Sequence, residues 1–184
     1  MESQPHWLWL YNQDSGELSV KLSEENSCQI AYKPSQLVNI HFERSELDIE
    51  DATVFQSTTE LLEGYPSDKL PCAIDDAALH AMAWKRFGRP QMPQSWHFQK
   101  SDITEWPEER RLCELNSGFD QGLFMIIDAD DEFASCVLLD ESMQLSAIKT
   151  MRQFQVIKVT FNRLLPATID LAMSSQSSWG QRLA

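Results

Sequence analysis

Two prolines within five residues divide this chain close to its midpoint. Residues 89–93 read Arg-Pro-Gln-Met-Pro, and proline lacks a backbone donor and disfavours helical geometry in the residue before it. An extended connector is therefore expected here. Strand and helix patterns alternate before the connector, whereas strand patterns dominate after it. A length of 184 residues can accommodate two small domains, so we expect an α+β chain with domains at residues 1–91 and 92–184.

The first domain opens with a predicted hairpin. Residues 7–11 are rich in aromatic and leucine side chains and precede a cluster of turn formers. Residues 18–22 alternate strictly, which is typical of a half-buried strand. The apolar face of this strand carries Leu18, Val20 and Leu22. Residues 27–32 predict a third strand that ends before a proline, and residues 36–42 give a weaker signal for a fourth.

Two amphipathic helices are predicted next. The first extends from the acidic segment 46–51 to about Glu63, so its negative start lies at the positive end of the helix dipole. The second ends before Gly88, and Asp75 or Asp76 is expected to cap its start. Its last turn carries Lys85 and Arg86.

The second domain is predicted to be mainly β. Clusters of turn-forming residues separate its strand candidates, which are residues 111–115, 123–127, 133–139, 145–151 and 154–161. The last of these alternates imperfectly, so a helix remains an alternative there. The serine-rich stretch Ser174–Ser178 is expected to be frayed.

The net charge argues against several classes of partner. Fifteen basic residues against 28 acidic ones give a formal net charge of −13, which disfavours nucleic acid and anionic membrane surfaces. No segment approaches the roughly 18 apolar residues of a membrane helix, and the N-terminus lacks the pattern of a signal peptide. We therefore expect a cytoplasmic protein with no membrane insertion and no nucleic-acid partner.

No motif predicts catalysis, a metal or a cofactor. The four cysteines lack CxxC spacing and the four histidines lack HExxH spacing, so the cysteines are interpreted as small buried hydrophobes. The six glycines form no phosphate-binding loop. A capping role explains Asp75 and Asp76 better than paired acid–base chemistry does, and the acidic run 128–132 is interpreted as a solvated turn. We expect no enzyme, no metal site and no cofactor.

Six tryptophans are the unusual compositional feature. Trp7 and Trp9 have the same parity on their strand and must face one side, which leaves Leu8 and Leu10 on the other. One of these sides is a candidate groove for a partner. Filling a small core explains tryptophans such as Trp7, Trp84 and Trp96, but tryptophan is also enriched at binding hot spots, and Trp96 is kept as a candidate contact.

The densest basic cluster of this acidic chain is Lys85, Arg86 and Arg89. A solvated helix end that complements the dipole accounts for these charges. The functional alternative is a docking patch for an acidic partner, because electrostatic steering favours such an encounter.

Two segments resemble a known family. Residues 72–79 read Cys-Ala-Ile-Asp-Asp-Ala-Ala-Leu, and residues 89–98 read Arg-Pro-Gln-Met-Pro-Gln-Ser-Trp-His-Phe. Together with the opening Trp-Leu-Trp at 7–9 and the segment 157–166, these residues resemble the ZapC family of Z-ring-associated cell-division proteins of gamma-proteobacteria.

The resemblance implies a cytoplasmic, non-enzymatic protein at the midcell division ring. It implies binding to the tubulin-like GTPase FtsZ and lateral association of FtsZ filaments. It also implies an N-terminal α/β domain followed by a barrel-like β domain. Arg89 matches a basic family position, Gln94 stands where the family often has lysine, and Val20 and Leu22 match apolar positions that could line a pocket.

The hypothesis is therefore an FtsZ-binding protein that stabilises the Z ring by bundling filaments. Cross-linking requires a valence of at least two, supplied by one surface per domain or by weak self-association. The candidate partner-binding residues are Val20, Leu22, Lys85, Arg86, Arg89 and Trp96. The alternative is a small-molecule-binding β-barrel with an aromatic interior, and a hydrolase or metalloenzyme is a distant third.

Overall fold

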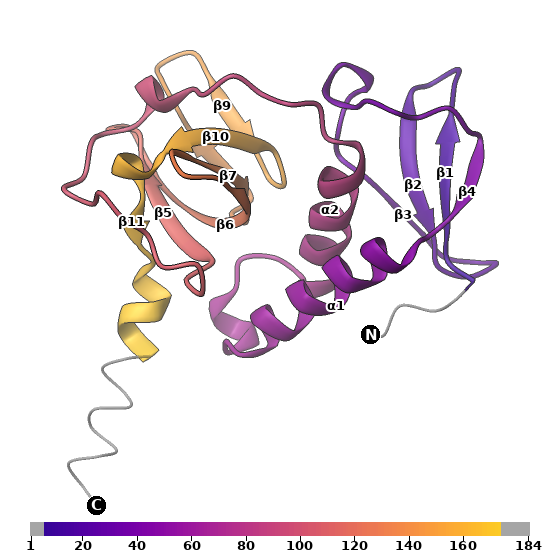
Figure 1. Ribbon diagram of the computed structural model, residues 1–184, viewed down its shortest axis with the longest axis horizontal. Helices are drawn as coiled ribbons and strands as arrows, with labels where there is room; N and C mark the ends of the chain where they lie inside the picture. Colours follow the sequence, from indigo (N-terminus) through magenta and orange to yellow (C-terminus); the bar gives the residue numbers. More distant parts are fainter. Residues whose placement is uncertain (1–5, 174–184) are drawn as a thin grey trace, which may run out of the picture. The chain divides into compact units, whose positions relative to one another are not determined.

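The computed structural model describes residues 6–173. The chain divides into two compact units, with the boundary between Gln91 and Met92. The first unit combines a four-stranded sheet with two helices, and the second is built on antiparallel strands (Figure 1). This arrangement is an α+β fold, as predicted. The serine-rich stretch from Ser174 lies outside the described residues.

The first sheet has the strand order β3-β2-β1-β4. The hairpin of β1 (Leu8–Asn12) and β2 (Glu17–Lys21) forms where the alternation predicts it, and β3 (Ser27–Gln29) extends it. Gly16 makes the tight turn possible because its φ of 71° lies in the left-handed region. The fourth strand, β4 (Arg44–Glu46), pairs with β1.

The predicted fourth strand at 36–42 is wrong. Residues 34–36 form the 3-10 turn η1 (Pro34–Gln36), and Asn39 has a φ of 62°, which interrupts an extended backbone. Leu37 pairs instead with Gly88, and the Val38 amide donates to the Phe87 carbonyl at 2.8 Å. The backbone groups of this segment therefore hydrogen-bond with the end of a helix that lies much later in the chain.

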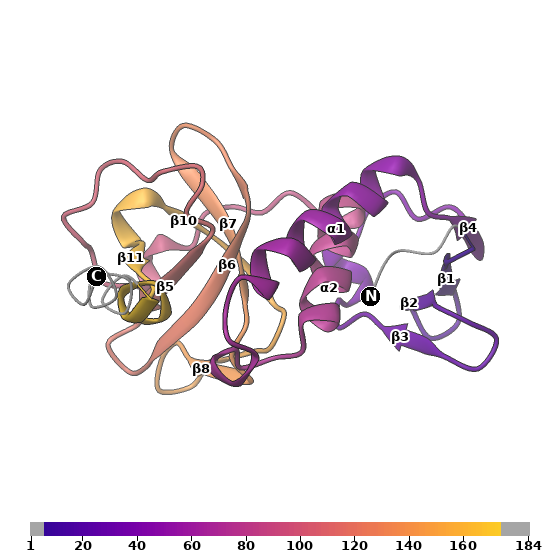
Figure 2. The ribbon, with the colours of Figure 1, turned by 90° about the horizontal axis from the view of Figure 1, so that it is seen from below.

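Two helices cover one side of this sheet, as Figures 1 and 2 both show. They are α1 (Ile49–Glu63) and α2 (Ile74–Phe87), with the short turn η2 (Ser67–Lys69) between them. Asp48 caps α1 by accepting from the Asp51 amide at 2.8 Å. The predicted capping of α2 by Asp75 or Asp76 is wrong: the N-cap residue is Ala73, and both aspartates lie within the first turn.

The core of the first unit forms between the sheet and the helices. Trp7 and Trp9 face this core together, as their parity predicts, and are 2% and 0% exposed. Trp7 packs edge-on against Phe55 at 5.1 Å between ring centroids, and Trp9 does the same against Phe87 at 5.0 Å. Such edge-to-face pairs add stabilisation beyond the area they bury.

The second unit is built on a five-stranded antiparallel sheet of order β10-β7-β6-β5-β11. Its strands are strongly twisted (Figure 2), and a register shift in β6 between Ile126 and Asp128 adds to the local twist. Within residues 6–173 no pairing joins the outer strands, so the sheet is not a closed barrel. The strands are β5 (Leu112–Asn116), β6 (Gln121–Ala129), β7 (Phe133–Leu138), β10 (Val156–Thr160) and β11 (Leu165–Pro166).

Residues 145–151 do not form the single strand that was predicted. They belong to a hairpin of β8 (Ser142–Gln144) and β9 (Thr150–Arg152). The Ser146 hydroxyl accepts from the Ile148 and Lys149 amides at 3.3 and 3.1 Å, and such a local serine turn competes with an extended strand. At 156–160 the chain is a strand, which resolves the helix alternative left open there.

The interior of the second unit is filled by its own side chains. Residues on the inner faces of β5, β6, β7 and β10 pack with the β8–β9 hairpin around Phe98, Phe124 and Met143. Cys113 and Cys136 lie in this core as buried thiols, as predicted, whereas Cys28 and Cys72 are only partly buried. The aromatic interior that the ligand-binding alternative requires is thus occupied by packed side chains.

Candidate functional site

The three residues of the predicted basic cluster have different environments. Lys85 and Arg86 lie in the last turn of α2, and Arg89 follows the C-cap residue Gly88. The end of the helix is anchored, because the Arg89 amide donates to the Gln36 carbonyl at 2.8 Å. Lys85 and Arg89 are exposed, whereas Arg86 is partly buried. The cluster is therefore two outward cations beside one that faces inward.

Arg86 is held by an internal network of charges. Its guanidinium donates to the carboxylate of Asp51, which is 3% exposed, and lies 3.6 Å from that of Asp48. The Trp9 indole donates to the same Asp51 oxygen at 2.9 Å. A buried carboxylate requires such partners to offset its lost hydration. Arg86 therefore has a structural role in this conformation.

The two apolar candidates of β2 also differ. Val20 is fully buried opposite Trp9, so it has no surface with which to touch a partner. Leu22 follows the strand and is half-buried, and its amide donates to the Asn26 carbonyl at 2.9 Å. Of this pair, only Leu22 lies where a partner can reach it.

The first sheet has an outer face, which the sequence indicated only through the alternation of side chains along the first strand. Leu8 and Leu10 are half-buried on this face, opposite the two core tryptophans. A hollow of about 540 Å³ lies beside Leu8. Its other lining residues are mostly polar and of both charges: His6, Lys21, Ser23, Glu24, Arg44 and Glu46.

Trp96 is the predicted partner-binding residue that lies in the second unit. It lies in the 3-10 turn η3 (Ser95–His97) and is 71% exposed, so it does not fill a core. The turn is fixed because Ser95 accepts from the Thr160 amide at 2.9 Å and from the Arg163 guanidinium at 3.0 Å. An exposed indole on a rigid turn has the character of a binding anchor.

Basic side chains contact or act on the residues that flank this tryptophan: Arg163 donates to the Ser95 carbonyl, and the charge of Lys149 acts on His97. Partial burial and the nearby charge of Lys149 lower the pKa of His97, whose ring lies 5.6 Å from that of Trp96. Next to Lys149, Ile148 is 98% exposed at the β8–β9 turn. We call Trp96, His97, Lys149 and Arg163 the Trp96 surface. It combines an apolar anchor with positive charge.

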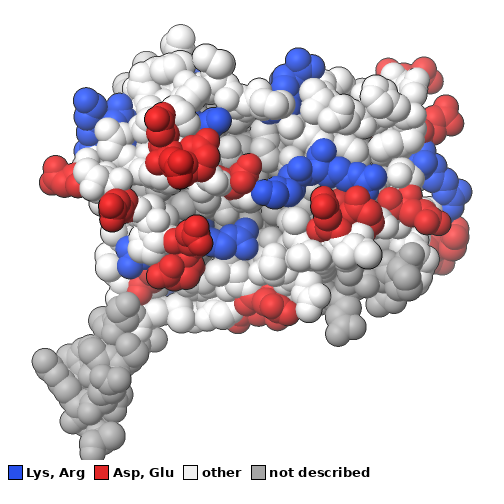
Figure 3. All heavy atoms as spheres, in the orientation of Figure 1, with Lys and Arg blue, Asp and Glu red and all other residues white. Residues whose placement is uncertain are grey.

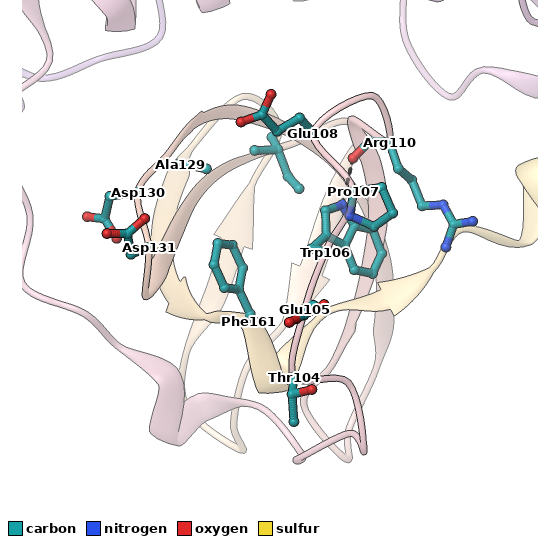
Figure 4. Close-up of a pocket in the computed structure, with 11 residues that line it drawn as sticks. Thr104, Glu105, Trp106, Pro107, Glu108, Arg110, Ala129, Asp130, Asp131 and Phe161 are labelled. Atoms are coloured by element: carbon teal, nitrogen blue, oxygen red, sulfur yellow. Dashed lines mark hydrogen bonds between the residues drawn. The ribbon is translucent and has the colours of Figure 1, made fainter.

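A second hollow lies at the edge of the C-terminal sheet and was not expected from the sequence. It measures about 450 Å³ and is bounded by the loop 104–110, the β6–β7 turn and Phe161, which begins η4 (Phe161–Arg163) (Figure 4). We call it the aromatic hollow, because the rings of Trp106 and Phe161 form its walls. In the sequence, the one signal that could have indicated this hollow is the dense run of acidic residues near Trp106.

The groups that resemble catalytic or metal-binding residues have structural partners. His80 is buried, and its Nε2 accepts from the Ala31 amide at 3.1 Å while Nδ1 lies 2.7 Å from the Asp76 carbonyl oxygen. Burial lowers the pKa of His80, so this ring stays neutral near pH 7. Among residues 6–173, no group of three or more potential ligands is arranged for a metal ion.

Surface charge is mixed on the face shown in Figure 3. Lysine and arginine side chains lie beside aspartate and glutamate side chains, without a broad field of either sign. A partner that approaches this face therefore meets side chains of both charges. No helix of residues 6–173 has the length and apolar character required to cross a bilayer.

The two units thus define a class of protein: an α+β chain whose described residues include exposed apolar side chains such as Trp96 and no metal-ligand cluster. Family comparison makes the assignment specific. Residues 1–89 match the model of the N-terminal part of cell-division protein ZapC, and residues 90–170 match that of its C-terminal part. This chain belongs to the ZapC family of cell-division proteins.

Individual relatives agree with the family models. The chain is 72% identical over 184 residues to cell division protein ZapC of Idiomarina loihiensis, with both chains covered completely. It is 32% identical over 163 residues to ZapC of Vibrio vulnificus, covering 88% of this chain and 89% of the relative. The ZapC of Shewanella oneidensis is also 32% identical, over 170 residues. The expectation of a cell-division protein of the ZapC family is thereby confirmed.

Proposed function

We propose that this chain binds FtsZ filaments directly at the midcell ring and bundles them. Family membership supports the cell-division role, and the exposed Trp96 on its fixed turn is the observation that carries direct binding. A large aromatic side chain that stays 71% exposed is best explained by a partner that covers it.

Each unit supplies one proposed contact surface. In the first unit the surface is the end of α2 with Lys85 and Arg89, and the half-buried Leu22 is a separate apolar candidate. In the second unit it is the Trp96 surface. Val20 and Arg86 are proposed to support the surface of the first unit without touching the partner, since Val20 packs in the core and Arg86 pairs with Asp51. Two surfaces on one molecule give the valence of two that cross-linking requires.

The net charge of −13 affects the electrostatics of the encounter between these surfaces and a filament. FtsZ filaments are acidic, so long-range repulsion opposes the encounter. Binding therefore needs an apolar centre with nearby basic groups, which is the composition of the Trp96 surface. Moderate salt screens the repulsion over a Debye length of about 8 Å at physiological ionic strength, so we expect binding to tolerate it.

Three finer features belong to the same proposal. Each unit is proposed to fold as an independent domain, with boundaries at 1–91 and 92–184. The twisted C-terminal sheet is proposed to curl around its core in a barrel-like manner. Weak self-association of the chain is proposed to add valence on a filament, where many copies are held close together.

The decisive experiment is sedimentation of FtsZ with GTP, at a speed that pellets bundles and spares single filaments. With this protein present, FtsZ and the protein should both move to the pellet. A run with GDP in place of GTP serves as the control, because it leaves no filaments to cross-link. If the protein stays in the supernatant and the FtsZ pellet is unchanged, the proposed function is wrong.

A further inference from the structure

The aromatic hollow of the second unit has the size of a ligand site. Its volume of about 450 Å³ falls within the roughly 300–1,000 Å³ that is typical of such sites. Three parts of the chain that are distant in sequence form its walls: the loop 104–110, the end of β6 with the following turn, and Phe161 (Figure 4). None of them belongs to the Trp96 surface or to the end of α2.

The apolar part of the hollow is rigid. Trp106 and Phe161 pack partly against the hydrophobic core, and Ile126, which also lines the hollow, is 7% exposed. The Trp106 indole donates to the Arg110 carbonyl at 2.6 Å, which fixes the orientation of its ring. Figure 4 shows Phe161 between Trp106 on one side and the turn with Asp130 and Asp131 on the other. The aromatic walls are thus preformed, which lowers the entropic cost of binding.

The charged part of the hollow is mainly acidic. Four carboxylates line it against a single guanidinium, that of Arg110: they belong to Glu105, Glu108, Asp130 and Asp131. All four acidic residues are exposed. A hydrogen bond from the Glu132 amide lowers the pKa of Asp130, and the charge of Lys158, which does not line the hollow, helps to lower it. Asp130 is fixed in place, because one of its oxygens accepts from the Glu132 and Phe133 amides at 2.8 Å each.

Trp106 already makes one cation–π contact. The Arg110 guanidinium lies over the Trp106 ring at 5.5 Å from the centroid, which is a cation–π distance. In Figure 4 it lies on the side of Trp106 away from Phe161. The region between Trp106, Phe161 and the four carboxylates is left open to a second cation.

We propose that the aromatic hollow binds a lysine- or arginine-bearing segment of a protein partner. The aliphatic stem of the basic side chain lies against the rings of Trp106 and Phe161, and its charged head meets the rim carboxylates. A peptide is favoured over a buried small molecule because the wall formed by 104–110 is an exposed loop that leaves room for a chain to continue past the anchor. This charge preference is opposite to that of the Trp96 surface, so it defines a separate site.

Binding of a labelled peptide to the full chain tests the proposal. The probe is a fluorescein-labelled peptide of three Gly-Arg repeats, measured by fluorescence anisotropy, with three Gly-Glu repeats as the negative peptide. We expect the arginine peptide alone to bind. The double change Glu105→Gln with Glu108→Gln should weaken its affinity at least about tenfold, which is about 1.4 kcal/mol, since it removes two of the four carboxylates that meet the charged head.

A matched control separates the site from the net charge. Glu25→Gln with Glu141→Gln removes two exposed carboxylates that do not line the hollow, and it should leave the affinity unchanged within twofold. If both double variants weaken binding equally, the peptide responds to net charge and the proposal is overturned. Absence of any arginine-peptide binding overturns it as well.

The position of the bound peptide can be read from the indole N–H signals in an NMR spectrum. The Trp106 signal is assigned by its loss in Trp106→Phe and should shift as the arginine peptide is added. A shift of the Trp96 signal in its place would put the peptide elsewhere and overturn the proposal. FtsZ sedimentation by the Glu105/Glu108 variant should match the unmodified protein, so this test is independent of the bundling function.

Discussion

At the scale of single residues, the Asp51 carboxylate is held by several partners in the first unit. It is 3% exposed and accepts from the Trp9 indole, the Arg86 guanidinium and the Asp48 amide. It therefore links the sheet, both helices and the start of α1 in one network. Breaking such a network costs more than any single surface ion pair contributes.

Asp51→Asn should lower the free energy of unfolding by about 2–3 kcal/mol. This is below the roughly 3–5 kcal/mol of a fully buried pair, because the Arg86 side chain is 27% exposed and can reach water. Urea denaturation followed by tryptophan fluorescence measures the loss. Asp14→Asn, at an exposed turn position, is the control and should change little. Equal stability of the two variants would contradict this account of Asp51.

His80 should make stability depend on pH. Burial lowers the pKa of this residue in the folded protein below its usual value of 6.5, so the unfolded chain takes up a proton first as pH falls. The stabilising effect of neutral His80 is present above pH 6.5 and is lost as pH falls through the lowered pKa.

The slope of unfolding free energy between pH 7 and 5.5 checks this expectation. Stability should fall over this interval, and the fall should be smaller in His80→Gln. The role given to His80 is wrong if its replacement leaves the slope the same.

At the scale of elements, the end of α2 depends on close packing at Gly88. A Cβ atom there would lie 2.5 and 2.6 Å from two ring atoms of Trp84 and 2.6 Å from the Trp84 carbonyl oxygen. Trp84 in turn packs edge-on against Tyr32 at 5.1 Å between centroids. The glycine thus lets the chain leave the helix and pair with Leu37.

Gly88→Ala should destabilise the first unit by about 1–3 kcal/mol, the usual cost of overpacking. Gly64→Ala at the end of α1 is a matched control, because the nearest atom to its Cβ is a carbonyl oxygen at 3.2 Å. Thermal unfolding followed by circular dichroism compares the two. A larger loss in the Gly64 variant would show that packing against Trp84 does not control this helix end.

At the scale of the whole molecule, bundling and binding should separate if each unit carries one FtsZ contact. Arg89→Glu changes an exposed residue of the first unit, and Trp96→Ala removes the exposed anchor of the second. Each variant should lose most bundling while retaining binding to single filaments, because one contact remains. Truncation of a hot spot costs about 2 kcal/mol or more, which is about 30-fold in affinity.

Low-speed sedimentation measures bundling, and high-speed sedimentation measures binding to filaments. Lys69→Glu is the charge control, because the exposed Lys69 precedes the start of α2 whereas Arg89 follows its end. Phe119→Ala removes another exposed aromatic side chain of the second unit, 59% exposed. Unchanged bundling by both test variants would remove these two surfaces from the proposal.

The sequence alone determined most of the local structure. Alternation placed β1, β2 and most strands of the second unit, and apolar spacing with end signals placed both helices, because these patterns depend on residues close in the chain. Parity alone put Trp7 and Trp9 on one face. The family resemblance likewise rested on contiguous motifs.

Only the tertiary structure decided which candidate residues can reach a partner. Arg86 and Arg89 look alike in the sequence, yet one is paired with a carboxylate 35 positions away and the other is exposed. Val20 is buried by helices that follow later in the chain, and the aromatic hollow joins loop 104–110 to Phe161. Burial and ion pairing arise from contacts between distant segments, so no local pattern can reveal them.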